Sequence, residues 1–171
     1  MIKIQPEKGE YDTAIHEINV LAFGREDEAR LVENLRKSPD FIPELSLVAV
    51  KDKRVIGYIL FSRVTIQTKV GSFPALALAP MAVHPEFQKQ GIGSKLKRQE
   101  FARCRNLGYK VVIVVGHPNY YPRFGFTSAR AKGLEAPFPV PDEVFMVIEI
   151  APGALNGISG MVIYPPAFDG V

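Results

Sequence analysis

An apolar stretch that runs into a glycine-rich loop constrains this chain more than any other feature. Residues 76–83 read Leu-Ala-Leu-Ala-Pro-Met-Ala-Val, and residues 84–94 follow with glycines at 91 and 93. The pattern predicts a buried strand, a turn, a glycine loop and the start of a helix. Because glycine lacks a Cβ, the loop backbone can approach a ligand closely. Unpaired N–H groups at the helix start then predict an anion site, most often for phosphate.

Three kinds of glycine loop are candidates for this motif. The phosphate loop of nucleoside triphosphatases needs a longer run that ends in Gly-Lys-Ser/Thr, and the sequence holds none. The dinucleotide loop needs a third small residue and an acid about twenty residues further on. Position 96 is Leu, and the next expected strand runs into Gly116 and His117 without a carboxylate. The third kind fits: Gln88-x-x-Gly91-x-Gly93 resembles the acetyl-CoA loop of the GCN5-related N-acetyltransferases.

A second feature of that family lies downstream. The apolar run 111–115 is followed by Gly-His-Pro-Asn at 116–119 and by Tyr-Tyr-Pro-Arg-Phe-Gly-Phe at 120–126. These segments resemble the family's fifth strand, its CoA-contacting asparagine, and its tyrosine five residues before a closing Gly-Phe, which places that tyrosine at Tyr121. The resemblance covers about residues 1–130 and is closest to small bacterial predicted acetyltransferases.

The resemblance implies a fold and a cofactor site. The fold would be α/β (α+β), with a central mixed but mostly antiparallel sheet that splays between its fourth and fifth strands and is flanked by helices. The pantetheine arm of acetyl-CoA, the cosubstrate, would enter that gap and bond to the strand backbone. The implied cofactor-binding residues are Met81, Ala82, Val83, Gln88, Lys89, Gln90, Gly91, Ile92, Gly93, Ser94, Asn119 and Tyr120.

Composition predicts one globular domain over residues 1–171. Hydrophobic residues make up 47% and charged residues 23%, and the single cysteine, Cys104, excludes an internal disulfide. The sequence has no secretion signal and no run of 18 apolar residues, so we expect a cytoplasmic protein without a membrane partner. A net charge of +3 does not indicate nucleic acid. Residues 86–110 carry seven basic and two acidic side chains, which suits anionic CoA.

Hydrophobic periodicity and turn residues predict the order of elements. We expect a strand at 1–4, a helix between Asp12 and Gly24, a helix at 26–37, strands at 46–50, 55–66 and 76–83, a helix at 92–107, and strands at 111–115, 144–150 and 160–164. Loops are expected at 39–43, 71–74 and 130–142, and an irregular tail at 165–170.

Individual residues refine this order. Asp12 is a candidate cap for the first helix, and Gly24 would end it. Pro80 cannot donate to a strand ladder, so we expect a bulge there or a point where two strands part. Glu100 falls on the apolar face of its helix, where pairing with Lys97 or Arg103 would explain it. Cys104 lies on the same face and is expected in the core.

The chemistry-bearing residues indicate direct transfer. His16, His84 and His117 lack metal-site spacing, so no metal is expected, and no Gly-x-Ser-x-Gly elbow marks a nucleophile. A bound amine would attack the thioester, whose carbonyl a backbone N–H near Met81 would polarise. Tyr121, which the resemblance marks, would protonate the leaving thiolate, since phenols are protonated at neutral pH. Glu26, Asp27, Glu28 and Glu143 are all candidates for the base.

The sequence leaves other aspects of function open. The runner-up function is a non-catalytic CoA-binding or sensing protein on the same fold. The acceptor is a small-molecule or peptide amine, and polyamines, amino acids, antibiotics and protein amines all stay open. A homodimer is one open assembly state.

Overall fold

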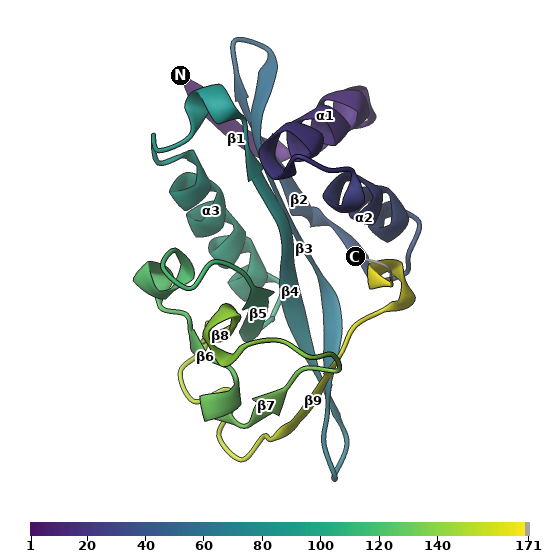
Figure 1. The fold of residues 1–171 in the computed structure, drawn as a ribbon, viewed down its shortest axis with the longest axis vertical. Helices are drawn as coiled ribbons and strands as arrows, with labels where there is room; N and C mark the ends of the chain where they lie inside the picture. The colour runs from purple at the N-terminus through teal and green to yellow at the C-terminus, as the bar shows by residue number, and fades with distance from the viewer. Residues whose placement is uncertain (170–171) are drawn as a thin grey trace.

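A nine-stranded sheet forms the centre of the computed structural model, which describes residues 1–169 (Figure 1). Its main path runs β1 (Ile2–Pro6), β2 (Phe41–Lys51), β3 (Arg54–Gln67), β4 (Ser72–Val83), β5 (Val111–Val115), β8 (Phe145–Glu149) and β6 (Thr127–Ser128). Off this path, β9 (Gly160–Ile163) pairs with β3 and with β7 (Leu134–Glu135). The β4–β5 and β7–β9 pairs are parallel, and the other described pairs are antiparallel. The expected mixed, mostly antiparallel sheet is confirmed.

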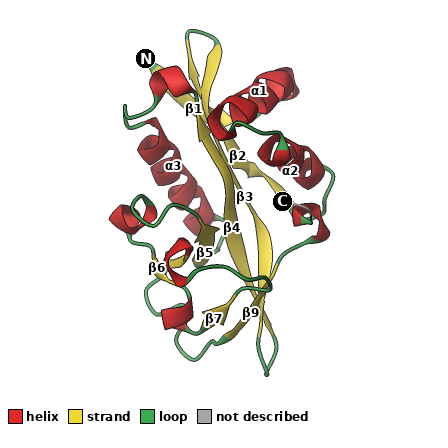
Figure 2. Ribbon diagram, viewed as in Figure 1, coloured by secondary structure: helices red, strands yellow, loops and turns green. Residues whose placement is uncertain are grey.

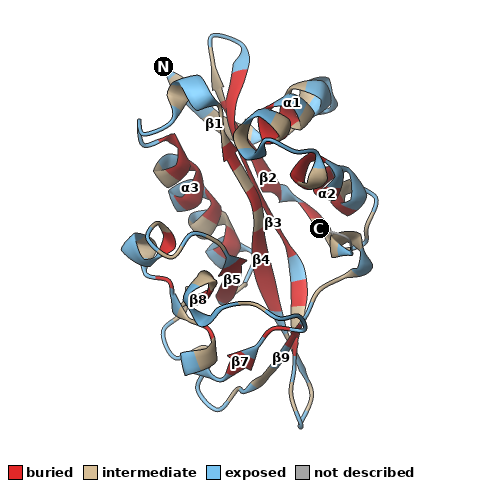
Figure 3. Ribbon diagram, viewed as in Figure 1, coloured by how far each residue is buried: buried red, intermediate tan, exposed pale blue. Residues whose placement is uncertain are grey.

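Helices cover both faces of this sheet (Figure 2). α1 (Asp12–Phe23) and α2 (Asp27–Arg36) lie on one face, and α3 (Ile92–Asn106) lies on the other. Strand alternation explains this layering, because successive side chains point to opposite faces. Leu47 and Ala49 belong to the buried cluster that contains Ile92 of α3, whereas the intervening Val48 belongs to the cluster that contains Ile15 of α1. Figure 3 shows the resulting band of buried residues along β2, β3 and β4.

Short 3₁₀ turns connect these elements. They are η1 (Gly9–Tyr11), η2 (Pro85–Phe87), η3 (Tyr121–Phe124), η4 (Arg130–Lys132), η5 (Asp142–Val144) and η6 (Pro166–Phe168). The loop expected at 130–142 therefore holds η4 and the short strand β7, and the tail expected at 165–170 holds η6. Gly170, the last residue of that expectation, lies outside the described residues.

The sheet parts at the position that Pro80 predicted. β4 and β5 pair only at Leu76 with Val112 and at Ala77 with Ile113. Beyond Ala77, β4 keeps its pairing with β3 but has no pairing with β5. The β3–β4 register shifts between Ile59 and Phe61, opposite the cis Ala79–Pro80 peptide. Both expected features, a bulge and a parting of strands, are thus present.

Two loops expected from proline lie partly in strands: residues 41–43 belong to β2 and 72–74 to β4, whereas 39–40 and Gly71 stay outside them. β2 begins at Phe41, whose partner is Ser62, so Pro43 lies within the strand. The register shift between Phe41 and Ser46 accommodates Pro43, because a bulge tolerates a missing donor. β4 begins at Ser72, and Pro74 pairs with Thr65 before β5 joins the sheet.

The capping prediction for Asp12 is wrong, whereas the stop signal at Gly24 is confirmed. Tyr11 occupies the cap position, and no side chain caps the α1 start. Asp12 is the first helical residue, and its carboxylate lies 3.5 Å from the Arg36 guanidinium. Gly24 ends α1 in the left-handed conformation at φ +70°, which glycine adopts without a steric penalty.

Candidate active site

A cavity of about 810 Å³ opens where β4 and β5 part. Its lining comes from both parted strands, from the end of α1 and start of α2, and from the C-terminal segment. The lining residues are Phe23, Arg25, Glu28, Leu31, Ala77, Leu78, Ala79, Pro80, Met81, Ile113, Val114, Val115, Gly116, His117, Tyr120, Tyr121, Pro137, Phe138, Ile163, Tyr164, Phe168 and Asp169. A mostly apolar cavity with a few polar groups is typical of a small-molecule site.

Tyr121 begins η3 and forms part of the cavity wall. Its side chain is 8% exposed, and its ring packs edge-on against Tyr120 and Phe126 at centroid distances of 5.1 and 5.6 Å. A Cβ at Gly116 would overlap the Tyr121 ring, so the absent side chain at Gly116 makes room for the tyrosine. Burial, and secondarily Tyr120, raises the pKa of Tyr121 well above its ordinary value, which keeps the phenol protonated at neutral pH.

Tyr120 connects this cavity to the glycine loop. A Cβ at Gly93 would lie 2.7 Å from the Tyr120 hydroxyl and 3.7 Å from the Met81 side chain. Gly93, Tyr120 and Met81 therefore meet at one point, although they come from α3, the β5–η3 connection and β4. The structure brings these three predicted residues together, with Tyr121 beside them.

The glycine loop has the backbone form that its sequence predicted. Gly91 caps α3 in the left-handed conformation at φ +82°, and a Cβ there would meet no atom within 4 Å. Lys89 is also left-handed, at φ 64°. The Gln88 side-chain amide donates to the Val83 carbonyl over 3.1 Å and ties the loop to β4. An exposed loop before a 15-residue helix fits an anionic group, because the first amides of α3 have no helical partner.

The other predicted cofactor residues have different positions. Ala82 and Val83 continue β4 beyond the parting, with Ala82 buried and Val83 half-buried. Gln90 is exposed in the loop, whereas Ile92 and Ser94 belong to the first turn of α3, with Ile92 in the core. Asn119 is exposed and does not line the cavity.

His117 lines the cavity, and a hydrogen bond indicates the tautomer of its neutral ring. The Asn119 backbone N–H donates to its Nδ1 over 3.2 Å. Neutral His117 therefore carries its proton on Nε2, where it acts as a donor rather than as a base.

Glu28 is the one of the four candidate bases that lines the cavity. Its side chain is 10% exposed, and Arg25 donates to both carboxylate oxygens over 2.9 and 2.6 Å. Asp27 pairs instead with Arg30 at 2.8 Å, and Glu26 lies 3.9 Å from His16. Glu143 belongs to η5, outside the cavity lining.

Two buried ionisable residues of α3, Lys97 and Glu100, do not form the expected pair. Neither the Lys97 Nζ nor the Glu100 carboxylate has a hydrogen-bond partner among the described residues. The Lys97 Nζ lies over the rings of Tyr120, Tyr121 and Phe124, at 4.1, 5.6 and 2.7 Å from their centroids. Burial, assisted by the charge of Arg123, lowers the pKa of Lys97 from 10.5 to about 7.

Glu100 shows the opposite response to burial. Burial raises the pKa of Glu100 well above 4.5, although Arg103 opposes this. Cys104 is fully buried in the same core, as expected, and burial also raises the pKa of its thiol. Glu100 and Cys104 are both buried and lie outside the cavity lining, so we assign them structural rather than chemical roles.

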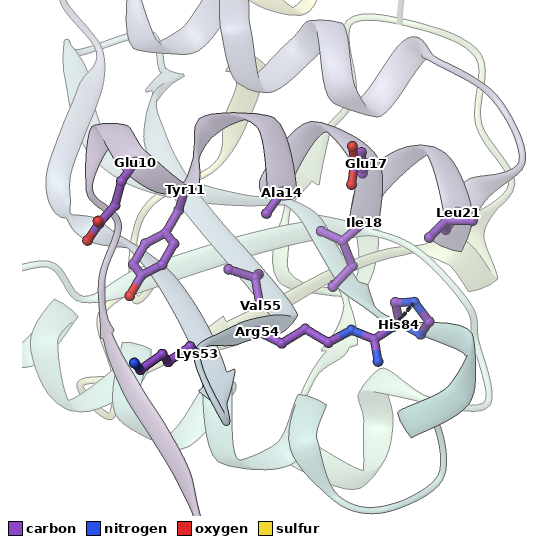
Figure 4. Close-up of a pocket in the computed structure, with 10 residues that line it drawn as sticks. All are labelled: Glu10, Tyr11, Ala14, Glu17, Ile18, Leu21, Lys53, Arg54, Val55 and His84. Carbon is purple, nitrogen blue, oxygen red and sulfur yellow. Dashed lines mark hydrogen bonds between the residues drawn. The ribbon is translucent and has the colours of Figure 1, made fainter.

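A second, smaller cavity of about 460 Å³ lies between α1 and the β2–β3 turn (Figure 4). Glu10 and Glu17 lie on its α1 side, and Lys53, Arg54 and His84 lie opposite. His84 accepts from the Glu86 N–H and contacts Arg54. The two cavities share no lining residue.

Residues 1–169 contain neither a candidate metal site nor a candidate membrane-spanning helix. Residues 1–169 hold no group of three or more His, Cys, Asp or Glu side chains arranged to bind a metal. Over the same residues, no helix has both the length and the apolar character needed to cross a membrane.

Comparison with known proteins identifies the family. The acetyltransferase (GNAT) domain model matches residues 43–128, which include β4, the glycine loop and Tyr121. The chain belongs to the GNAT acetyltransferase family. This acetyltransferase is 42% identical over 130 residues to the uncharacterized N-acetyltransferase YjhQ of Escherichia coli, with 75% of this chain and 72% of YjhQ covered.

Solved structures support the same assignment. The GNAT family N-acetyltransferase YhbS from Escherichia coli, in complex with CoA, superposes with a TM-score of 0.91 at 32% identity. That match covers 98% of this chain and 91% of YhbS. A GNAT family acetyltransferase from Brucella melitensis, in complex with acetyl-CoA, gives 0.80 at 29% identity, with 99% of each chain covered. The predicted family and enzyme class are confirmed.

Proposed function

We propose that this acetyltransferase moves an acetyl group from acetyl-CoA to an amine by direct attack, with Tyr121 as the general acid. The supporting observation is the place of Tyr121, protonated and buried in the cavity wall where β4 and β5 part. The glycine loop and the start of α3 would hold the pyrophosphate. Met81, Ala82 and Val83 would offer backbone hydrogen bonds to the pantetheine, and Asn119 and Tyr120 would add contacts.

The proposed chemistry conserves every proton. The neutral amine nitrogen attacks the thioester carbonyl carbon, and a backbone N–H near Met81 stabilises the oxyanion. The carbon–sulfur bond then breaks, and the Tyr121 hydroxyl gives its proton to the departing thiolate. The acylated nitrogen loses a proton through water, which restores the phenol. Glu28 lies at the cavity wall and is suited to take the first proton from the incoming ammonium through water, because its carboxylate keeps free lone pairs beside Arg25.

The raised pKa of Tyr121 is compatible with this role. An ordinary thiol has a pKa of about 8.5, below that of an ordinary phenol near 10. The burial that raises the pKa of Tyr121 would also raise the pKa of the CoA thiol formed beside it. Proton transfer from Tyr121 to the thiolate then removes a poorly solvated negative charge.

Substitution of Tyr121 by phenylalanine tests the proposal. Tyr121→Phe keeps the ring and its packing and removes only the donor. We expect kcat to fall by about 10²–10⁴-fold, measured as thiol release with acetyl-CoA and an accepted amine, while CoA affinity stays unchanged. Tyr109→Phe is the matched control, because the Tyr109 hydroxyl accepts from Arg63 outside the cavity. Full turnover by Tyr121→Phe would show that another group protonates the thiolate.

A further inference from the structure

Large apolar side chains collect at the mouth of the main cavity instead of in the core. Phe23, Phe138 and Ile163 are 40%, 42% and 44% exposed, and all three line the cavity. They come from the end of α1, the segment before η5, and β9. Grouped exposed apolar side chains around a cavity indicate a binding surface for an apolar ligand.

Three aromatic rings from the C-terminal half form one wall of this mouth. Phe138 and Tyr164 lie 5.6 Å apart between ring centroids, and Tyr164 and Phe168 lie 5.1 Å apart in an edge-on arrangement. Burial raises the pKa of Tyr164 to about 12, so its phenol is uncharged at neutral pH. η6, which carries Phe168, lies beside α2 (Figure 1). We call Phe138, Tyr164 and Phe168 the aromatic wall.

The charged groups of the cavity favour a cation over an anion. Among the lining residues within 1–169, Glu28 and Asp169 contribute two carboxylates, against the single guanidinium of Arg25. Arg25 already donates to both oxygens of Glu28 and lies 3.6 Å from Asp27. A ligand carboxylate would therefore compete with an existing ion pair and face an excess of negative charge. An ammonium group meets neither obstacle.

Resting on the proposed acetyl transfer, we infer that the acceptor is a small arylalkylamine, a primary amine carried on an aromatic body without a carboxylate. The aromatic wall would pack against the acceptor's ring, while the amine points toward the parted strands and Tyr121. The wall favours a ring over an alkyl chain, because aromatic pairs gain attraction beyond the area that they bury. Phe138, Tyr164 and Phe168 are thus the residues that set acceptor preference.

A panel of amines with acetyl-CoA tests this inference. 2-Phenylethylamine and tryptamine carry a ring and no carboxylate. Hexylamine lacks the ring, spermidine is a polycation without a ring, and phenylalanine adds a carboxylate. A peptide with an N-terminal phenylalanine tests a macromolecular acceptor. We expect kcat/KM for the two arylalkylamines to exceed that for every other amine by about tenfold or more, the size of one aromatic contact.

A matched pair of variants locates the preference. Phe138→Ala should raise KM for 2-phenylethylamine about tenfold and leave KM for acetyl-CoA unchanged, because the ring is exposed and lies outside the core. Leu107→Ala removes an apolar side chain that is also 42% exposed but lies at the end of α3, and it should change neither constant. Phe138→Tyr should keep the low KM.

Titration calorimetry of 2-phenylethylamine into the CoA-saturated protein separates this inference from the proposed function. Binding that Phe138→Ala weakens, without acetyl transfer, would support the acceptor class and overturn the proposed reaction. Transfer to spermidine, hexylamine, phenylalanine or the peptide in preference to arylalkylamines would overturn the acceptor class and leave the reaction intact. If neither binding nor transfer occurs with any amine, both are wrong.

Discussion

Replacement of Lys97 by methionine should stabilise the protein below neutral pH and have no effect above about pH 10.5. The Lys97 side chain is 1% exposed, and its ammonium contacts the faces of three aromatic rings. These rings attract a cation, but they replace its water only in part. Methionine keeps the length and flexibility of the side chain and removes the charge.

The pKa of Lys97 sets the size and direction of this effect. The pKa falls from 10.5 to about 7 on folding, which corresponds to about 5 kcal/mol at 1.36 kcal/mol for each pH unit. We expect about half of this, ~2 kcal/mol, because the flexible stem lets the ammonium move toward water. Below pH 7 Lys97 is protonated in both the folded and the unfolded state, so the folded state carries the full free-energy cost of burying the ammonium. Between about pH 7 and 10.5 the unfolded state binds more protons, so wild-type stability rises with pH.

Urea unfolding of wild type and Lys97→Met at pH 6, 8 and 10 measures this difference. Other titrating groups cancel in the comparison, since both proteins contain them. The advantage of methionine should be largest at pH 6 and should decline steadily toward pH 10. Lys95→Met, on the exposed side of the same helix, should show no such trend. A difference that does not depend on pH, or a loss of stability at pH 6, would refute the argument.

Other variants test the buried acid and the glycine loop. Glu100→Gln should stabilise the protein at pH 8 and not at pH 4. The raised pKa of Glu100 makes wild-type stability fall as pH rises above about 4.5. Urea unfolding at the two pH values measures this difference. Gly91→Val, at φ +82°, and Gly93→Val, against the Tyr120 hydroxyl, should each weaken CoA binding at least tenfold in calorimetry while circular dichroism shows a folded protein. Unchanged affinity in a folded variant would place the phosphates elsewhere. CoA at 100 times its Kd should stabilise the wild type by about 2.7 kcal/mol in thermal unfolding, and NAD should not.

The features that the sequence predicted well depend on local backbone chemistry. Gly24 and Gly91 adopt left-handed conformations that few other residues tolerate, so their positions mark the end of α1 and the start of α3. Pro80 lacks a donor, and it lies where β4 loses β5 as a neighbour. These glycine and proline positions can be interpreted from the local sequence alone, without contacts to distant residues.

The features that the sequence did not predict depend on tertiary pairing. Pro43 and Pro74 are turn formers, yet pairing with β3 draws both into strands. No hydrophobic periodicity in the sequence connects Phe138, Tyr164 and Phe168. Their rings meet where β9, which ends just before Tyr164, pairs with β3 and β7. Aromatic residues on both sides of β8, Phe138 before it and Tyr164 and Phe168 after it, were the available signal, and nothing local connected them to a cavity.

The two sides of the cavity come from different parts of the chain, which bears on how the acceptor preference of the enzyme can evolve. β4, the glycine loop and Tyr121 lie within the family-matched residues 43–128. Glu28 precedes that stretch, and the aromatic wall follows it. Under the proposed roles, mutations in the two terminal segments would alter which amine enters, while the residues proposed to hold the acetyl donor are inherited unchanged. Such a division of roles would let a lineage acquire new acceptors without an ancestor that binds CoA poorly.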